Sequence, residues 1–363
     1  MNFTLLCKKC GKVYPMITYY WKCPSCNFPF NLITQLSKFN QFNQIIDKNE
    51  RGLWRYRKLI PFSEGLVTLG EGNTPIVEMK DEGVILKLEY FSPTGSFKDR
   101  GAAVSLSRAK FMGVGSIVED SSGNAGIAAA AYAAKANIRA RIYVPKDAPS
   151  AKRMIIRACG AEIVECESRK DASIRAVSEL RENELYVGHI WDAFYIEGIK
   201  TIAFEVFESG HIPDAIIVPV ASGTLLLGLF KGFFELNEMG LLNNIPEFYA
   251  VQGEECAPIY EAIYGKIGGI KNSSLADGLR VDDPPRKDEI LSVIRATSGD
   301  VFIVNNNEIM GALKFLYRKG IIVEPTSATA YAAFRKTRGL GKVLIPMTGT
   351  GIKTIDRLNL IFE

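Results

Sequence analysis

The chain has 363 residues, of which 47% are hydrophobic and 23% are charged, as in an ordinary globular protein. It contains 44 Lys and Arg against 40 Asp and Glu, and this net charge of +4 is too small to predict a nucleic-acid-binding surface. The 32 Gly and 16 Pro follow no period, which excludes a collagen-like or low-complexity chain. At about 150 residues per domain, the length predicts two domains and a small addition.

No segment is predicted to cross a membrane. The longest run without charge covers the 16 residues between Asp214 and Lys231, and Pro219 and Gly223 interrupt it. A spanning helix needs about 20 apolar residues. The first residues, MNFTLLCKKC, lack the apolar core and cleavage site of a secretory signal. We therefore expect a cytoplasmic protein with no membrane partner.

Four of the seven cysteines form two Cys-x-x-Cys pairs close to the start of the chain. Two such turns can place four thiolates at the corners of a tetrahedron, which is the geometry of a structural zinc site. The residues between the pairs favour strands, so residues 1–35 are predicted to form a zinc ribbon. Two disulfides or four unligated thiols also fit the spacing, although a reducing cytoplasm disfavours disulfides. The candidate ligands are Cys7, Cys10, Cys23 and Cys26.

Residues 36–75 are polar and irregular, and they are predicted to form a helix and a connector. Farther along the chain, short apolar runs alternate with helical patterns, which predicts βαβ units and parallel sheets. The run DDPPRKDE at 282–289 is predicted to be a surface loop, because it holds two prolines and many charges. Strands are expected at 84–90, 116–120, 140–145, 161–166, 184–189, 214–220, 247–252 and 342–347, and helices at 97–113, 125–136 and 171–183.

Ligands of open α/β sheets bind where strands end and helices begin. Small and hydroxyl residues gather at such junctions in SPTGSFKDRG (92–101), SSGNAG (121–126), VASGT (220–224) and TGTG (348–351). Backbone N–H groups at the start of a helix bind phosphate well. Each loop taken alone could equally serve close packing.

Lys98 stands at the start of a predicted helix. The positive end of a helix should lower the pKa of a lysine, and a neutral amine can attack a carbonyl. A solvated lysine beside Asp99 would explain the same residue. The three neighbouring loops that suit anions favour the chemical role.

These motifs, together with EPTSA (324–328) and EGIKT (197–201), resemble those of the fold-type-II pyridoxal-phosphate enzymes, and specifically the threonine synthases of archaeal type. The resemblance covers nearly the whole chain. It implies two open parallel-sheet α/β domains of the tryptophan synthase β-like architecture, with an N-terminal zinc ribbon, in a homodimer. The implied division is a ribbon at 1–35, a connector and first part of the large domain at 36–89, a small mobile domain at 90–205, and a large cofactor-binding domain at 206–363.

The resemblance also implies the roles of individual residues. Lys98 would carry pyridoxal 5'-phosphate as a Schiff base and then act as general base. Asn124 would bind the 3-oxygen of the cofactor ring, and Thr348 would face the pyridine nitrogen. The implied lyase reaction converts O-phosphohomoserine and water to threonine and phosphate by γ-elimination and β-addition. The cofactor phosphate would be held by Ala221, Ser222, Gly223, Thr224 and Leu225.

The chain departs from this pattern where several bacterial threonine synthases bind the substrate phosphate. His189 and Ile190 stand in place of an Asn-Ser pair, and Tyr195 stands in place of an arginine. His189 could meet substrate or serve the structure. A cation on a neighbouring predicted helix could replace the missing arginine, and the candidates are Lys152, Arg153 and Arg157. The same three residues could equally form a solvated helix face.

Two other functions remain open. One is a sister enzyme with the same cofactor, such as a threonine or serine ammonia-lyase or a cysteine or cysteate synthase. The other is a catalytically silent relative that binds a ligand or partner through the ribbon. The presence of Lys98, Asn124 and Thr348 together argues against the silent relative.

Overall fold

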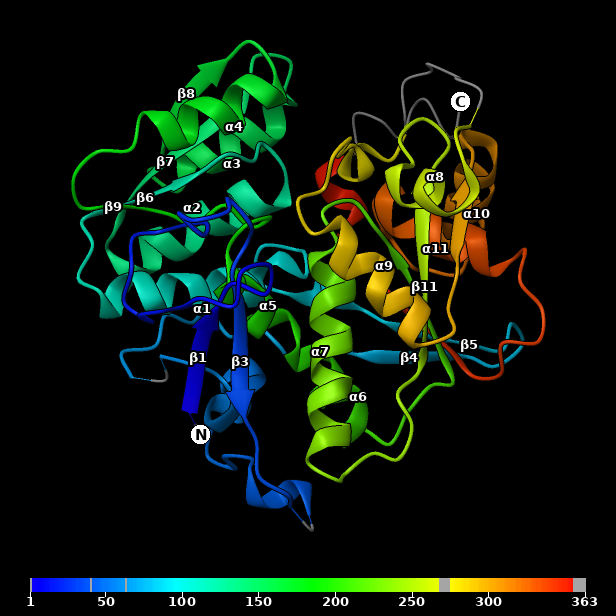
Figure 1. Cartoon of the computed structure of the whole chain (residues 1–363). Helices are drawn as coiled ribbons and strands as arrows, with labels where there is room; N and C mark the ends of the chain where they lie inside the picture. Colours follow the sequence, from blue (N-terminus) through cyan, green and yellow to red (C-terminus); the bar gives the residue numbers. More distant parts are fainter. Residues whose placement is uncertain (1, 40, 63, 268–274, 355–363) are drawn as a thin grey trace.

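The computed structural model describes residues 2–39, 41–62, 64–267 and 275–354. Figure 1 shows two α/β lobes, one around a four-stranded sheet and one around a six-stranded sheet. In the part of the chain that the structure describes, no helix is both long and apolar enough to cross a membrane.

The six-stranded sheet has the order β12-β11-β10-β13-β5-β4, and only the pair at the β4 edge is antiparallel. Its central strands are apolar and buried throughout, as in parallel sheets that helices cover on both faces. The strands are β4 (Ile76–Met79), β5 (Val84–Lys87), β10 (Ala215–Pro219), β11 (Glu247–Gly253), β12 (Val301–Val304) and β13 (Val343–Pro346). The helices of this lobe are α6 (Thr201–Glu208), α7 (Thr224–Glu238), α8 (Pro258–Tyr264), α9 (Lys287–Ala296), α10 (Asn306–Arg318) and α11 (Pro325–Phe334).

The four-stranded sheet is parallel throughout and has the order β8-β7-β6-β9. Together the two sheets confirm the predicted fold class. The strands are β6 (Ser116–Glu119), β7 (Arg139–Pro145), β8 (Glu162–Cys166) and β9 (Glu184–Tyr186). The helices are α1 (Lys98–Phe111), α2 (Asn124–Ala136), α3 (Ser150–Ala158), α4 (Arg169–Ser178) and α5 (Ala193–Ile199).

The N-terminal segment forms a small antiparallel sheet of β1 (Asn2–Leu6), β2 (Val13–Tyr14) and β3 (Asn31–Gln35). It packs against the four-stranded lobe, where the ring of Trp21 meets that of Trp191 edge-on at 4.9 Å. Arg108 of α1 also donates a hydrogen bond to the carbonyl of Thr18.

The connector after this sheet differs from the prediction. Its described residues contain the 3₁₀ helices η1 (Phe42–Gln44) and η2 (Gly52–Leu59) and no α-helix. Three more such turns are η3 (Glu89–Phe91), η4 (Asp277–Leu279) and η5 (Gly351–Thr354).

The predicted surface loop at 282–289 was also wrong in part. Helix α9 begins at Lys287, and the side chain of Arg286 is fully buried. Its guanidinium donates to the carbonyls of Phe30 at 2.8 Å and Trp191 at 3.1 Å, and it pairs with Glu289 at 2.9 Å. Carbonyl and carboxylate partners therefore allow an arginine to occupy the interior.

Helices α1 and α5 cross where glycine on each allows close approach. A Cβ on Gly101 would lie 2.1 Å from the ring of Tyr195, and a Cβ on Gly198 would lie 1.9 Å from the carbonyl oxygen of Arg100. The Tyr195 hydroxyl then donates to the carbonyl of Lys98 at 2.7 Å. The crossing thus fixes the first turn of α1.

A buried charge cluster holds the same turn from the other side. Arg100 pairs with Glu89 and with Glu205 of α6, each at 2.7 Å. Lys87, the last residue of β5, pairs with Glu205 at 2.6 Å. Burial alone would raise the pKa of Glu205, but the charges of Arg100 and Lys87 outweigh burial and hold this pKa below its usual range.

We predict that Gly198→Ala destabilises the protein by about 3 kcal/mol, because the new methyl group would overlap the backbone oxygen of Arg100. The control is Gly311→Ala in α10, where a Cβ meets nothing within 4 Å. This control should leave stability unchanged or raise it by about 0.5–1 kcal/mol through helix propensity. Urea unfolding measures both changes. Equal stability of the two variants would contradict the close crossing.

Candidate active site

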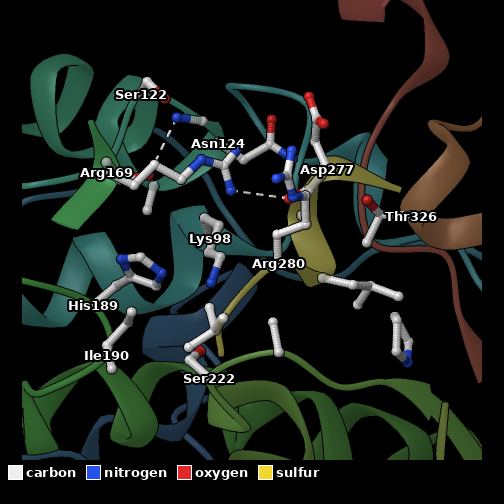
Figure 2. A pocket seen from close by; sticks show the side chains of 18 of the residues that line it. Lys98, Ser122, Asn124, Arg169, His189, Ile190, Ser222, Asp277, Arg280 and Thr326 are labelled. Carbon is white, nitrogen blue, oxygen red and sulfur yellow. Dashed lines mark hydrogen bonds between the residues drawn. The ribbon is translucent and has the colours of Figure 1, made fainter. Parts of the chain in front are cut away.

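A cavity of about 660 Å³ lies between the two lobes, at the carboxyl ends of the parallel strands of both sheets. Figure 2 shows Lys98 projecting into it from the start of α1. The loops after β6 and β10, His189 and Ile190 after β9, and the 324–326 segment line the rest. Strand ends of two sheets therefore converge on one lysine, as open α/β sheets predict.

The amine of Lys98 sits in an apolar setting. Its Nζ lies 4.6 Å from the ring centre of Phe97 and 5.8 Å from that of Tyr195. Burial lowers the pKa of Lys98 to about 8, while negative charge on Glu119 and Glu324 opposes this shift. A lysine with this pKa is about one tenth neutral at pH 7, far more than an ordinary lysine, and the neutral form is the one that attacks a carbonyl.

All five residues predicted to hold a phosphate lie together on the wall of the cavity, in the turn from β10 to α7. Gly223 has a φ of +84°, and a Cβ there would lie 2.3 Å from the side chain of Ile290. The first N–H groups of α7 have no preceding helical turn to bond. N–H groups of this kind suit an anion, and the Ser222 and Thr224 hydroxyls, which lie 3.4 Å apart, belong to the same turn. The residues are Ala221, Ser222, Gly223, Thr224 and Leu225.

Asn124 begins α2 and lines the same cavity. Its amide nitrogen donates to the carboxylate of Glu324 at 3.0 and 3.2 Å, and its oxygen accepts from Lys353 at 2.8 Å. Lys353 also donates to the carbonyl of Thr94 at 2.8 Å. The amide is therefore held in one orientation by two charged groups.

Thr348 follows β13 and lines the cavity. Its hydroxyl lies 2.8 Å from that of Ser327 and donates to Glu324 at 3.4 Å. Its carbonyl accepts from the N–H of Phe97 at 3.0 Å, which joins this strand end to the segment before Lys98. The next residue must be small, because a Cβ on Gly349 would lie 2.4 Å from the Glu324 carboxylate.

The three residues that differ from the bacterial phosphate-binding pattern do not all line the cavity. His189 and Ile190 line the cavity. The ring nitrogen Nδ1 of His189 lies 2.9 Å from Glu119. Tyr195 is buried beneath Lys98, and burial raises its pKa well above the usual value. Tyr195 therefore supports the lysine through packing and a hydrogen bond.

Of the three cations proposed on α3, Lys152 alone lines the cavity. Arg153 and Arg157 pair with Glu165 at 3.0 and 3.4 Å and do not line the cavity, which agrees with the solvated helix face left open for them. The sequence reasoning missed three other positive residues of the cavity wall, which had no local motif to mark them: Arg169, Lys170 and Arg280. Arg169 reaches from α4 to the carbonyl of Asp277 at 3.2 Å.

The donor set suits pyridoxal 5'-phosphate. One cavity presents a reactive amine, an anion cradle, a fixed amide and a neutral hydroxyl. The amine is the group that an aldehyde requires, and the cradle is the group that a phosphate requires. Glu324 lines the same cavity, and Lys353 adds to the set through its hydrogen bond to Asn124. Sequence reasoning assigned neither residue a role.

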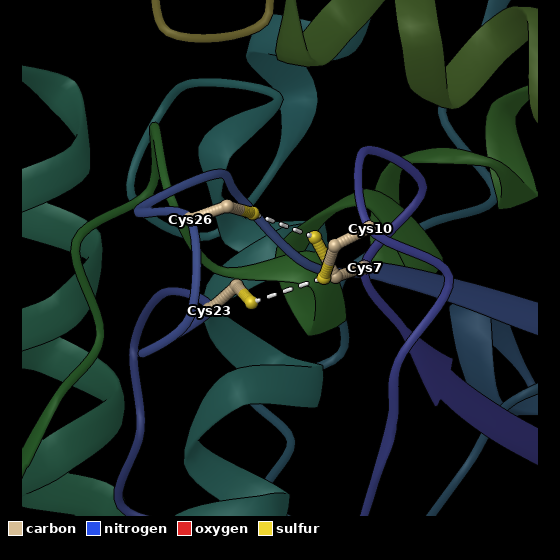
Figure 3. Close-up of side chains that lie close together, drawn as sticks. All are labelled: Cys7, Cys10, Cys23 and Cys26. Carbon is tan, nitrogen blue, oxygen red and sulfur yellow. Dashed lines mark hydrogen bonds between the residues drawn. The ribbon is translucent and has the colours of Figure 1, made fainter.

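The four N-terminal cysteines also lie together, and their sulfur atoms are all within 4.8 Å of one another (Figure 3). Cys7 and Cys26 sulfurs are 3.4 Å apart, and those of Cys10 and Cys23 are 3.6 Å apart. These separations are close to the edge of about 3.8 Å of a tetrahedron with 2.3 Å metal–sulfur bonds. The four thiols therefore have a spacing that fits a tetrahedral metal ion.

The two cysteine turns have matching backbones. The N–H of Gly11 donates to the carbonyl of Cys7, and the N–H of Asn27 donates to that of Cys23, both at 2.8 Å. Both donors have left-handed backbones, with φ of +71° for Gly11 and +58° for Asn27. Glycine and asparagine are the residues that adopt this conformation most readily.

Comparisons with known proteins agree with this geometry. The family model of the pyridoxal-phosphate-dependent enzymes matches residues 67–349. The threonine synthase of Methanocaldococcus jannaschii is 30% identical, over 96% of this chain and 93% of its own. That of Synechocystis is 31% identical, over 83% of this chain and 82% of its own.

Solved structures show the same architecture. Maize serine racemase superposes with a TM-score of 0.65 and 26% identity, over 79% of this chain and 91% of its own. A fungal L-serine ammonia-lyase from Rhizomucor miehei shares the fold, with a TM-score of 0.67, 22% identity, and coverage of 80% and 98%. The chain therefore belongs to the family of pyridoxal-phosphate-dependent enzymes, in its threonine synthase branch.

Proposed function

We propose that this enzyme is a lyase that converts O-phosphohomoserine and water to threonine and phosphate. The observation that carries the proposal is the joint placement of the Lys98 amine and an anion cradle in one cavity, with further cations on its wall. A substrate that carries a phosphate needs positive charge beyond the cradle that serves the cofactor. Lys152, Arg169 and Arg280 supply such charge.

Each predicted residue has a role in this proposal. When bound, pyridoxal 5'-phosphate supplies an electron sink for negative charge at the α-carbon. Lys98 holds the cofactor and then moves the α-proton with its amine. The N–H groups and hydroxyls of 221–225 hold the cofactor phosphate, and Asn124 orients the ring. Thr348 offers a neutral hydroxyl to the ring nitrogen, which leaves that nitrogen largely unprotonated.

We further propose that the cavity closes on substrate. The small domain at 90–205 would move against the large domain at 206–363, to which residues 36–89 belong. The hydrogen bond from Arg169 to Asp277 joins the two sides of the cavity at a place where closure would bring them together. Closure would exclude bulk water until the step that adds one water molecule. The proposal keeps the homodimer that the family resemblance implies.

One observation favours a second candidate. Ile190 presents an apolar side chain to the cavity next to His189, and neither is a strong phosphate ligand. A sister enzyme that acts on threonine, serine or O-phosphoserine would tolerate this wall. The substrate assay below separates the two candidates.

We expect the cofactor-loaded protein to release phosphate from O-phosphohomoserine and to form one threonine for each phosphate. Phosphate release and amino-acid analysis measure the two products. Arg153→Gln serves as a matched control on α3, since Arg153 pairs with Glu165 and should leave the rate unchanged. Turnover of threonine, serine or O-phosphoserine without any turnover of O-phosphohomoserine would establish the sister function.

Burial makes the loading of the cofactor pH-dependent. The pKa of Lys98 is about 8, so the neutral amine accumulates as the pH rises through 8. We expect the rate of covalent loading, followed by visible absorbance, to rise with pH and level off above about 9. Lys98→Ala should show no such absorbance and no turnover. A rise that continues to the ordinary lysine pKa of 10.5 would contradict the effect of burial.

We also propose that Cys7, Cys10, Cys23 and Cys26 bind one structural zinc ion. Four protein ligands leave no open position on zinc, which suits a structural role. The matching turns at Gly11 and Asn27 support this assignment, because they aim both sulfurs of each pair at one point.

Metal analysis tests the zinc proposal. We expect about one zinc per chain in the wild type and none in Cys23→Ala. Loss of the metal should lower the melting temperature by on the order of 5 °C, because the ribbon loses its main link. Cys159→Ala is the control, since Cys159 lies outside the cluster. A Cys23→Ala protein with unchanged metal content would refute the site.

A further inference from the structure

His189 and Glu119 form a buried pair beside Lys98. Glu119 ends β6 and His189 follows β9, and these strands are neighbours in the four-stranded sheet. One carboxyl oxygen of Glu119 lies 2.9 Å from Nδ1 of His189, and the other accepts from the His189 backbone N–H at 3.1 Å. The side chain of Glu119 is 1% exposed and that of His189 is 15% exposed. Both oxygens of the carboxyl group are therefore bonded to one residue.

The buried setting shifts both members of the pair toward their neutral forms. Burial raises the pKa of Glu119 well above its usual value, and the neighbouring Asp120 adds to this rise, while Lys98 opposes it. Burial lowers the pKa of His189, and the charge of Lys98 lowers it further. When Glu119 carries a proton, its hydroxyl donates to Nδ1, and the ring proton of a neutral His189 then resides on Nε2.

Because Nδ1 is bonded to Glu119, Nε2 is the ring nitrogen of His189 that remains for the cavity. His189 lines the cavity together with Lys98, and Figure 2 shows the imidazole near the lysine amine. The ring centre of Tyr195 lies 6.0 Å from that of His189 and 5.8 Å from the Lys98 Nζ, so Tyr195 packs close to both groups. Within the described residues, no hydrogen bond occupies Nε2. The cavity therefore contains a ring nitrogen that the protein leaves available, and this nitrogen is an N–H donor in the tautomer above.

The proposed reaction needs a proton at one specific atom. A phosphate monoester is close to a dianion at neutral pH. When the bond from Cγ to oxygen breaks, the electron pair stays on the bridging oxygen, and phosphate would leave as a trianion unless that oxygen takes up a proton. Lys98 is engaged in moving the α-proton, so a second acid is required.

We propose that His189 is this acid and that Glu119 positions and recharges it, an inference that rests on the proposed function. The proton on Nε2 goes to the bridging oxygen as the Cγ–O bond breaks. The Glu119 proton passes to Nδ1, which leaves a neutral imidazole and a carboxylate that accepts two hydrogen bonds. Water that later adds at the β-carbon returns a proton to Nε2, and the Nδ1 proton returns to Glu119. The relay thus avoids a buried imidazolium.

Other ionisable groups also face the pair. They are Lys98 of α1, Asp120 after β6, Tyr186 of β9, Asp192 before α5 and Tyr195 of α5. Asp120 is already bonded to the hydroxyls of Tyr186 and Ser173, and Asp192 to that of Ser105. Lys98 is therefore the closest cationic influence on the relay.

Two variants test the relay in the cofactor-loaded enzyme. Glu119→Gln can donate an amide N–H to Nδ1 and keep the Nε2–H tautomer, but it holds no transferable proton. His189→Gln keeps a hydrogen-bond donor without acid chemistry. We expect each to lower the kcat of phosphate release by about 100-fold or more, with KM changed by less than about threefold. His211→Gln is the control, because His211 lies on the surface and contacts Glu78.

A substrate without a leaving group separates removal of the α-proton from the departure of phosphate. Exchange of the α-hydrogen of 2-aminobutyrate with deuterated water needs Lys98 but no acid at Cγ. Both variants should keep this exchange within about threefold of the wild-type rate. If exchange falls as steeply as phosphate release, the pair supports the cofactor site in general, and the inference is overturned.

Nitrogen-15 NMR of the imidazoles gives a readout apart from activity. The chain has only two histidines, so His211→Gln assigns the spectrum. We expect a neutral His189 ring with its proton on Nε2 between pH 6 and 8. A charged ring at pH 7, or variants with wild-type kcat in an active enzyme, would overturn the relay. A wild-type enzyme that releases no phosphate would instead overturn the proposed function, and the relay would fall with it.

Discussion

The buried pairing of Arg100 with Glu89 and Glu205 is the constraint on which the site depends. Arg100 lies two residues after Lys98 on α1, Glu89 follows β5, and Glu205 belongs to α6. Charges inside a protein are tolerated only when they are paired and hydrogen-bonded. Together with Lys87, the cluster contains two cations and two anions, and separating α1 from Glu89 or Glu205 would leave some of these charges without a partner, so the proposed closure has to keep these contacts. The lysine at the start of α1 is therefore held by the interior of both lobes.

The same low-polarity surroundings determine the chemistry of the site. Burial makes the Lys98 amine less basic, and it raises the pKa of the Glu119 carboxyl group. Burial thus shifts both an amine and an acid at one cavity toward their neutral forms. Fully paired charges behave differently, as Glu205 shows with its lowered pKa. The distinction between reactive and structural charges is therefore one of partners rather than of residue type.

Sequence reasoning predicted the features that arise from local patterns. Apolar runs marked eight of the strands, and glycine and hydroxyl residues marked the loops that line the cavity, because turns and anion cradles require small residues at adjacent positions. Strand β12 was missed, since it is a four-residue edge strand whose middle residues are only partly buried. The 3₁₀ helices of the connector were missed because their sequences lack a helical period.

Charged residues with distant partners could not be predicted. Lys353 binds Asn124 across 229 positions, and Arg286 binds Phe30 across 256. In the sequence, each is one of 44 Lys and Arg residues and looks solvated. Glu119 lay in a predicted strand, but only the pairing of β6 with β9 brings it to His189. The motifs located the cavity, and the long-range contacts determine the state of its acids and bases.

The position of the ribbon in the chain has a consequence for synthesis. Its contacts with the rest of the protein come from residues made much later, such as Trp191 and Arg286. A ribosome adding about 5–20 residues per second needs roughly 13–50 s to go from Phe30 to Arg286. During that interval the ribbon has none of these partners, and its small sheet cannot bury a core of its own. A metal ion bound by four early cysteines would let this segment fold as soon as it emerges, and the later helices would then assemble on a finished surface.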